Sequence, residues 1–190
     1  ASASGIEISS RFILTDNFKM YATYAYTDAK LTADAPYLFA VVDEQGTELQ
    51  DHYDGKDGDR LPGSPKQQFS LGATYNAELF DLPLDINYGF TYQSDIYSKV
   101  GLRADGEVLP GYALSNIQAK LADDNWAVTL YIDNLFDKYA FSSVRRDKGD
   151  IDLAKFDDMN ANGGDIQRNY GHYLIEPRKI GIRFEYLFDL

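Results

Sequence analysis

The chain has 190 residues, 44% of them hydrophobic, and a formal net charge of −12 at pH 7. This acidic balance argues against nucleic acid as a partner, because its phosphates would be repelled. The chain has no cysteine, which excludes disulfides and thiol chemistry. The mean hydropathy is −0.39, and no apolar run is long enough for a membrane-spanning helix.

Seven stretches of the sequence alternate apolar and polar side chains, and the apolar side carries no charge in any of them. In chain order they are residues 6–14, 18–26, 68–75, 84–93, 112–121, 126–133 and 179–188. In the last stretch, Ile180, Ile182 and Phe184 share one face, whereas Lys179 and Arg183 share the other. A period of two predicts extended strands with one apolar and one wet face. Strands of about ten residues, tilted by about 45°, span the apolar band of an outer membrane.

The connections between these stretches distinguish a membrane barrel from a soluble barrel whose apolar faces line a pocket. Short connections alternate strictly with long ones. The short ones are residues 15–17, 77–83 and 122–125, and the long ones are residues 32–66, 94–111 and 138–176. Outer-membrane barrels have tight periplasmic turns and long extracellular loops. We therefore predict an all-β, transmembrane antiparallel β-barrel in which the first and last strands run toward the periplasm.

Aromatic side chains on the apolar faces gather toward both ends of the predicted strands. Those next to the short turns or the C-terminus are Phe18, Tyr75, Trp126, Tyr186 and Phe188. Those toward the long connections are Tyr24, Tyr26, Phe69, Phe90 and Tyr92. Rings with a polar edge prefer the headgroup level, so the pattern predicts two aromatic girdles around an aliphatic belt. Tyr88 and Phe184 fall in mid-strand and are exceptions.

The number of predicted strands is odd, whereas bacterial single-chain barrels have an even number. Either a further strand lies within a long connection, with residues 141–146 as the candidate, or strands are missing upstream. We favour missing strands, because open edges of unpaired backbone are not tolerated in lipid. The chain begins without an initiator methionine or signal peptide and enters a strand almost at once, so we expect a mature fragment.

The long connections carry most of the acidic residues and are expected to be solvated. They contain 18 of the 30 Asp and Glu residues of the chain. Outside a bacterial cell such loops could bridge to lipopolysaccharide phosphates through divalent cations. We favour the simpler interpretation, in which the charges provide solubility and local repulsion.

The third long connection holds the best candidates for binding a small extracellular ligand. It combines aromatic rings with cationic donors: Tyr139, Phe141, Arg145, Arg146, Arg168, Tyr170 and His172. Arginine binds carboxylate or phosphate groups bidentately, and aromatic rings stack on catechols or sugars. The alternative is that each arginine only offsets nearby aspartates.

Other site chemistry is sparse, and we predict no enzyme, cofactor or resident metal. His52 and His172 are the only histidines, and no nucleophile-elbow motif surrounds a serine of the long connections. Asp158, Asn160 and Asn162 alternate as in the first half of a calcium loop, but the position of the bidentate Glu is Asn169. A polar, turn-rich loop is the favoured interpretation of this segment.

Four motifs in order resemble the barrels of TonB-dependent outer-membrane receptors. Asn134, Leu135, Phe136 and Asp137 match the family's NLFD signature. The other three segments resemble places where the chain re-enters the membrane before a strand: residues 58–66, 109–112 and 176–182. The resemblance covers the chain essentially from end to end. From physics alone, Asn134 and Asp137 are expected to hydrogen-bond local backbone and end a strand.

The resemblance implies an outer-membrane location and a 22-stranded barrel filled by an N-terminal plug. It also implies energy-dependent uptake of a scarce nutrient, such as siderophore-bound iron, haem, cobalamin or a carbohydrate. The TonB complex would act through the plug, which this chain lacks. Residues 1–190 would be the C-terminal part of the barrel, with about its last seven strands. The competing interpretation is a stand-alone barrel of about eight strands with an adhesive or structural role.

Overall fold

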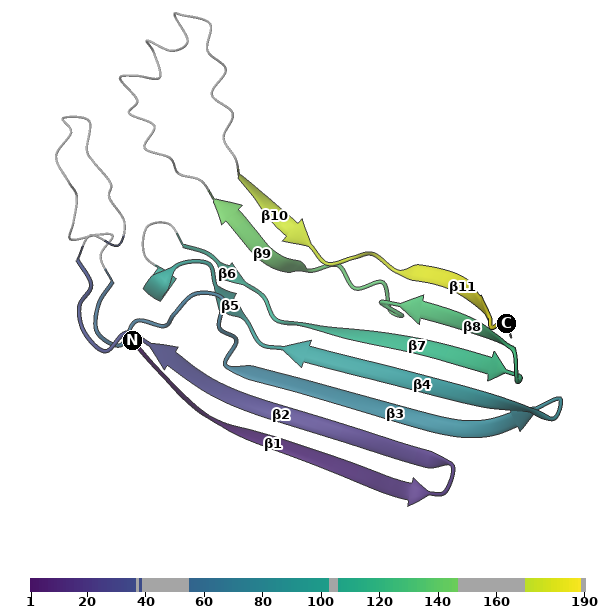
Figure 1. Ribbon diagram of the computed structural model, residues 1–190. Helices are drawn as coiled ribbons and strands as arrows, with labels where there is room; N and C mark the ends of the chain where they lie inside the picture. The colour runs from purple at the N-terminus through teal and green to yellow at the C-terminus, as the bar shows by residue number, and fades with distance from the viewer. Residues whose placement is uncertain (37, 39–54, 103–105, 147–169, 189–190) are drawn as a thin grey trace, which may run out of the picture.

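The computed structural model describes residues 1–36, 38, 55–102, 106–146 and 170–188. Seven strands form one antiparallel sheet in the order β1-β2-β3-β4-β7-β8-β11 (Figure 1). Their bounds are Ser2–Thr15, Phe18–Lys30, Gln67–Leu79, Leu82–Gln93, Tyr112–Ala122, Trp126–Asp133 and Lys179–Tyr186. Within the described residues, no helix is long and apolar enough to cross a membrane. The all-β, antiparallel prediction is confirmed, and the strands form an open section of sheet.

Most strands extend beyond their predicted ends, and the prediction of a turn over residues 77–83 is wrong. β3 and β4 continue until Phe80 and Asp81, which form the turn alone, with φ angles of 55° and 63°. Two successive residues with positive φ match the twist of a two-residue hairpin. Pro83 therefore lies inside β4, opposite Glu78. The sequence concealed this turn because neither Phe nor Asp at these positions is accompanied by the usual glycine.

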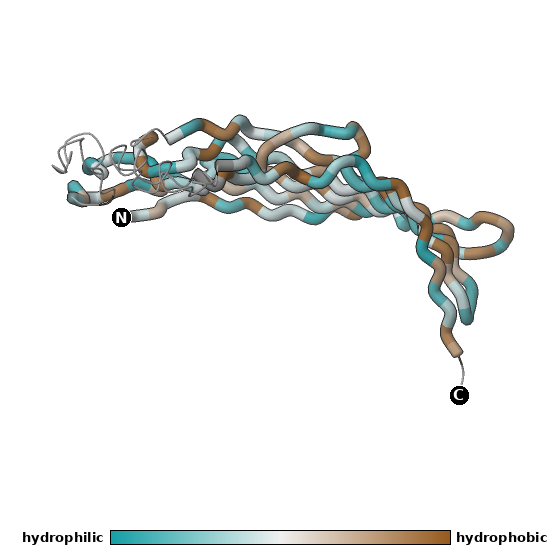
Figure 2. The backbone as a smooth tube through the Cα atoms, turned by 90° about the horizontal axis from the view of Figure 1, so that it is seen from above, coloured by the Kyte–Doolittle hydropathy of each residue, from teal (hydrophilic) through white to brown (hydrophobic). Residues whose placement is uncertain are grey.

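The strand register places all seven apolar faces on one side of the sheet. Directly paired residues share a face, and one row runs from Ala22 through Leu71 and Phe90 to Ser115. Farther along the sheet, Leu130 pairs with Ile182 on the same face. The other face is polar, as predicted. Figure 2 shows the resulting alternation of hydrophobic and hydrophilic positions along neighbouring strands.

Aromatic pairs lie at the strand ends where girdles were predicted. At the short-turn end, the rings of Phe18 and Tyr75 are 6.4 Å apart. At the opposite end, the register aligns Tyr24, Phe69 and Tyr92 in one row. Outer-membrane barrels carry aromatic girdles at both ends of their apolar band.

The two mid-strand exceptions have different explanations. The hydroxyl of Tyr88 lies 2.9 Å from Oγ of Ser115, which is only 3% exposed. This hydrogen bond satisfies both hydroxyl groups within the apolar face, where an unpaired one would be costly. Phe184 has no polar atom in its side chain and can lie anywhere along an apolar strand face.

The three long connections all leave the same end of the sheet, and the short turns lie at the other end (Figure 1). We call the long connections the first loop (residues 31–66), second loop (94–111) and third loop (134–178). The second loop contains β5 (Ile96–Tyr97), the short 3-10 helix η1 (Val100–Leu102) and β6 (Val108–Leu109). The third contains β9 (Phe141–Arg146) and β10 (Tyr170–Leu174). The second and third loops therefore contain regular secondary structure of their own.

The candidate strand at residues 141–146 exists, but it does not belong to the seven-stranded sheet. β9 pairs only with β10 in a separate hairpin of the third loop. The count of strands in the main sheet therefore stays at seven.

A small apolar core lies at the loop end. Of the five buried apolar side chains among the described residues, four are in or beside the first two loops: Ala29, Ile96, Val100 and Leu109. Ile96 pairs with Leu109 across β5 and β6. A Cβ on Gly55 of the first loop would clash with the side chains of Leu31 and Leu38, and it would be in ordinary contact with Val100 of the second loop. The first and second loops therefore pack together through apolar contacts.

Candidate functional site

The NLFD segment closes the end of β8 through the side chain of Asn134. This residue is 4% exposed and has a φ of 50°, a conformation that asparagine tolerates. Its Nδ2 donates to the carbonyl oxygens of Lys138 (2.9 Å) and Glu176 (3.0 Å), and its Oδ1 accepts from the Lys138 amide at 2.8 Å. Asp137 Oδ1 accepts from the amide of Arg178 at 3.0 Å. The predicted role of Asn134, a hydrogen bond to nearby backbone where the strand ends, is confirmed. Asp137 differs, because its side chain bonds the amide of Arg178, 41 positions away in the chain.

These bonds also fix the base of the third loop. Glu176 and Arg178 immediately precede β11, whereas Asn134 and Asp137 immediately follow β8. These side chains therefore connect the two ends of the third loop to each other. The β9–β10 hairpin extends from this connected base.

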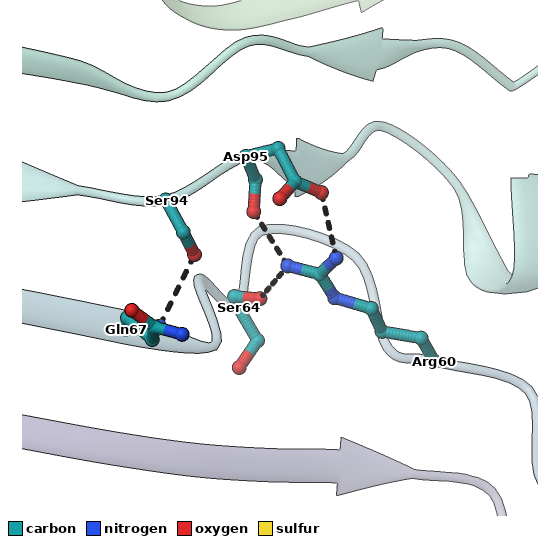
Figure 3. A network of polar contacts seen from close by, with 5 residues as sticks. All are labelled: Arg60, Ser64, Gln67, Ser94 and Asp95. Atoms are coloured by element: carbon teal, nitrogen blue, oxygen red, sulfur yellow. Dashed lines mark hydrogen bonds and ion pairs between the residues drawn. The ribbon is translucent and has the colours of Figure 1, made fainter.

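The first and second loops are joined by the guanidinium group of Arg60 (Figure 3). Arg60 Nη1 donates to Oδ2 of Asp95 at 2.8 Å, and Nη2 donates to the carbonyl oxygens of Ser64 (2.9 Å) and Asp95 (2.5 Å). The guanidinium carbon lies 4.6 Å from the ring centroid of Tyr97. The Arg60 side chain is only 12% exposed. In this partly buried setting the ion pair is less screened by solvent than a surface pair.

The second and third loops meet at His172 and Glu107. His172 Nε2 lies 3.0 Å from Oε1 of Glu107, with side chains 23% and 27% exposed. The contact is an ion pair when the imidazole carries its second proton, and the two groups are not aligned as a hydrogen bond. The amide of Glu107 donates to Oγ of Ser98 at 2.7 Å, which fixes the backbone beside β6.

An aromatic row continues from His172 along the third loop. The rings of His172 and Phe141 are 4.3 Å apart, and those of Phe141 and Tyr139 are 5.5 Å apart at a steep angle. Tyr139 is 69% exposed, so the row ends at the surface. It offers an apolar, polarisable face to a planar ligand group.

The register of the β9–β10 hairpin divides the predicted ligand-binding residues. Arg146 pairs with Tyr170, and Val144 pairs with His172, so these positions share one face of the hairpin. Arg145 pairs with Gly171 on the other face. Arg168, His52 and the calcium-loop candidates Asp158, Asn160 and Asn162 lie outside the described residues.

Sequence reasoning missed the residues that connect the loops to one another. Arg60 was noted only as part of a strand-preceding motif, and Asp95, Tyr97 and Glu107 were not singled out. No local pattern marks them, because Arg60 and Asp95 are 35 positions apart in the chain. The charges of these residues suggest a contact only once the strand order shows that they lie near one another.

The polar face of the sheet contains a hollow of about 250 Å³. Tyr21 and Tyr131 contribute rings to its lining, and Gly89, which has no side chain, leaves open space. A Cβ on Gly72 would lie 2.0 Å from a carbon of the Tyr21 ring. The ring therefore lies directly on the glycine backbone of the neighbouring strand.

The family model described as "TonB dependent receptor-like, beta-barrel" matches residues 1–135. The chain belongs to the TonB-dependent receptor family. It is accordingly an outer-membrane protein of Gram-negative bacteria, and the three long loops are extracellular. No curated protein matches the sequence.

Solved structures of similar fold are outer-membrane receptors of low sequence identity. The siderophore receptor PiuA from Acinetobacter baumannii is 21% identical, with a TM-score of 0.64 over 96% of this chain and 21% of that chain. The ferric yersiniabactin uptake receptor FyuA from Yersinia pestis is 13% identical, with a TM-score of 0.67 over 98% and 23%. The ferric citrate transporter FecA is 20% identical, with a TM-score of 0.62 over 97% and 24%.

The chain spans less than a quarter of the length of each of these receptors. At these identities the likeness shows the fold of the sheet, and the loops have to be interpreted from their own residues.

Proposed function

We propose that the chain supplies part of the barrel wall and three ligand-capturing loops of a receptor that imports a scarce nutrient. The observation that carries this proposal is the extracellular layer, in which side chains tie the second loop to the first and to the third. Arg60 and Asp95 make one connection, and Glu107 and His172 make the other. Connected loops of this kind, at the extracellular end of a receptor sheet, are suited to binding a ligand from outside the cell.

Siderophore-bound iron is the first candidate among the nutrients. The three similar structures are described as receptors or transporters for siderophores, ferric yersiniabactin and ferric citrate, which supports this choice. The row of Tyr139, Phe141 and His172 would stack on a planar chelating group. Positions Arg146 and Tyr170, on the His172 face of the hairpin, would add donors for carboxylate or catecholate oxygens. Haem, cobalamin and carbohydrates remain the alternative cargoes.

Energy for uptake would come from the TonB complex through a plug domain in the full-length receptor. On this proposal, residues 1–190 are the C-terminal part of the barrel, and the acidic loops face lipopolysaccharide. The competing proposal, a stand-alone small barrel, is weakened by membership of the receptor family.

The test is a shortened third loop in the full-length receptor. Residues 147–169 are deleted, and Arg146 is joined to Tyr170 through an Asn-Gly turn that preserves the β9–β10 hairpin. Whole cells are then assayed for binding of radiolabelled ferric citrate, a ferric catecholate, haem and cobalamin. A receptor with Gly-Ser residues in place of the short turn at residues 123–125 is the matched control.

We expect the deletion, which removes Arg168 but keeps Tyr139, Phe141 and His172, to weaken binding of the one cargo that the parent receptor recognises. Phe141→Ala in the undeleted loop should abolish it, and the control should bind normally. Unchanged affinity at normal surface expression would remove the deleted segment of the third loop from the site. The remaining candidates would then be the rest of that loop and the first two loops.

A further inference from the structure

We propose that Arg60 is a positioning residue that makes the first two extracellular loops one rigid platform. This platform then holds the third loop, through Glu107 and His172, in the geometry that captures ligand. The proposal rests on the function proposed above and adds to it the device that fixes the relative places of the loops.

The backbone of Arg60 is anchored to the sheet. Arg60 pairs with Lys30 at the end of β2, and the amide of Leu61 donates to the carbonyl of Ala29 at 2.9 Å. The first loop therefore returns to the sheet at Arg60, so this side chain starts from a fixed point. Arginine on a fixed backbone loses less conformational freedom when it binds than arginine on a free loop.

The guanidinium group reaches past a whole strand. Asp95 follows the end of β4, and β3 lies between β2 and β4 in the sheet. Neighbouring strands are about 4.8 Å apart, so the Arg60–Asp95 contact joins two strand ends roughly 10 Å apart. It thereby fixes the first loop against the second at the barrel mouth.

Further contacts surround the same junction and give it a single arrangement. The amide of Gly63 donates to the carbonyl of Tyr97 at 2.9 Å, and the amide of Gly101 donates to the carbonyl of Arg60 at 3.0 Å. The Arg60 side chain also stacks on the ring of Tyr97. The same two loops also share the apolar core that includes Ile96 and Val100.

Only arginine can make this set of contacts at once. Its planar fork donates to a carboxylate and to two carbonyl oxygens while its face lies on an aromatic ring. Lysine keeps the charge but has one compact ammonium group, which cannot reproduce the fork or the stacking. Substitution by lysine therefore removes the hydrogen-bond and stacking geometry of Arg60 and keeps its positive charge. The effect of this variant can then be assigned to the geometry.

The platform contacts the third loop through a residue of the second loop. Glu107 precedes β6, whose Leu109 belongs to the apolar core, and its carboxylate meets His172 of β10. A second loop that is free to shift would carry Glu107 with it. The aromatic row that begins at His172 would then lose its fixed place relative to the first loop.

The experiment measures loop geometry and uptake in the full-length receptor. Because this chain has no cysteine, spin labels can be placed at chosen exposed positions after any cysteine elsewhere in the receptor is replaced. One pair, Ala33→Cys with Val108→Cys, reports the first loop against the second. Another pair, Val108→Cys with Ser143→Cys, reports the second against the third. Distance distributions are recorded by pulsed electron paramagnetic resonance in outer-membrane vesicles.

The variants are Arg60→Lys and Asp95→Asn, with Lys56→Gln as the matched control. Lys56 is also a cation of the first loop, but its partner Asp34 lies in the same loop. We expect Arg60→Lys and Asp95→Asn to broaden both distance distributions, and Lys56→Gln to leave them narrow. Asp95→Asn keeps the test decisive should Arg60→Lys fail to assemble, as judged by heat-modifiable migration on gels.

Uptake of radioiron ferric citrate and a ferric catecholate provides the functional measurement. We expect Arg60→Lys to raise the KM for the transported complex by about tenfold, which corresponds to about 1.4 kcal/mol. The maximal rate per receptor should stay unchanged, because the barrel and the energy-coupling step are intact. A merely structural role would lower the amount of assembled receptor and leave the KM of the assembled fraction the same.

Narrow distributions in both variants, or broad distributions with an unchanged KM, would overturn the positioning role. Failure of the proposed function would look different. The parent receptor would then take up none of the iron complexes, while the variants would still broaden the distances and so support the platform alone.

Discussion

Asn134 shows how one side chain can both end a strand and close a loop. It is buried, has a positive φ and makes three hydrogen bonds to backbone groups of Lys138 and Glu176. Each bond satisfies a backbone group at the point where the sheet ladder stops, and unsatisfied groups are costly at the membrane surface.

We expect Asn134→Ala to destabilise the receptor by about 2–4 kcal/mol, because it leaves several backbone groups without partners and strains a positive φ. The measurement is the guanidinium unfolding midpoint of the full-length receptor in lipid vesicles. Asn125→Ala, at an exposed position in a short turn, is the control and should change stability little. Equal effects of the two substitutions would contradict the closing role of Asn134.

Arginine substitutions at Leu130 and Gln118 test which face of the sheet meets lipid. Leu130 is 57% exposed on the apolar face, and Leu130→Arg should cost about 2–4 kcal/mol in a bilayer. Thr129 is the obvious comparison on the polar face, but it is 6% exposed and lies between Lys120 and Arg183 in the register. A new positive charge there would be repelled for a separate reason.

Gln118 is the better control, because it is exposed on the polar face and pairs with Tyr131, next to Leu130. Gln118→Arg should cost much less than Leu130→Arg when unfolding is followed in vesicles. Similar costs at the two positions would show that the faces have been assigned wrongly.

At the scale of elements, tyrosine rings on glycine backbone hold neighbouring strands together on the polar face. Tyr21 of β2 lies on Gly72 of β3, and Tyr131 of β8 lies against Gly181 of β11. Glycine weakens a strand, and a ring that covers it from the next strand restores the lost packing.

A double-mutant cycle tests the Tyr21–Gly72 contact. Gly72→Ala should destabilise the parent receptor by about 1 kcal/mol, because the new Cβ displaces the ring. In a Tyr21→Ala background the same change should be neutral or stabilising, because alanine suits a strand better than glycine by about 0.5–1 kcal/mol. The coupling energy comes from unfolding midpoints in vesicles, and additive effects would mean that the ring contributes nothing at this glycine.

At the scale of the whole molecule, the seven-stranded sheet has two open edges, β1 and β11. Unpaired backbone groups at an edge are costly in lipid and attract other strands. The chain produced by itself should therefore oligomerise or aggregate through these edges, and it should show no energy-dependent uptake.

Size-exclusion chromatography in detergent and amide hydrogen exchange measure this behaviour. Broad, high-mass species with rapid exchange along β1 and β11 are expected. A monodisperse monomer with slowly exchanging edges would instead support the stand-alone small barrel.

The sequence by itself determined the strands of the seven-stranded sheet. The alternation that defines residues 126–133 coincides with β8, and the apolar faces of all seven strands proved to be one surface. These features were predictable because the alternation of a strand and its exposure in a membrane both depend on residues that are close together in the sequence. The strand-ending role of Asn134 was predictable for the same reason, since its partners include the nearby backbone of Lys138.

Only the tertiary structure decided how the loops are connected. Arg60 meets Asp95, and Glu107 meets His172, because the strand order brings separate strand ends together at one end of the sheet. The hairpin of β9 and β10 likewise depends on a pairing across residues 147–169. Such contacts form between positions far apart in the chain, and no local pattern of residue types encodes which loop side chain will lie opposite which.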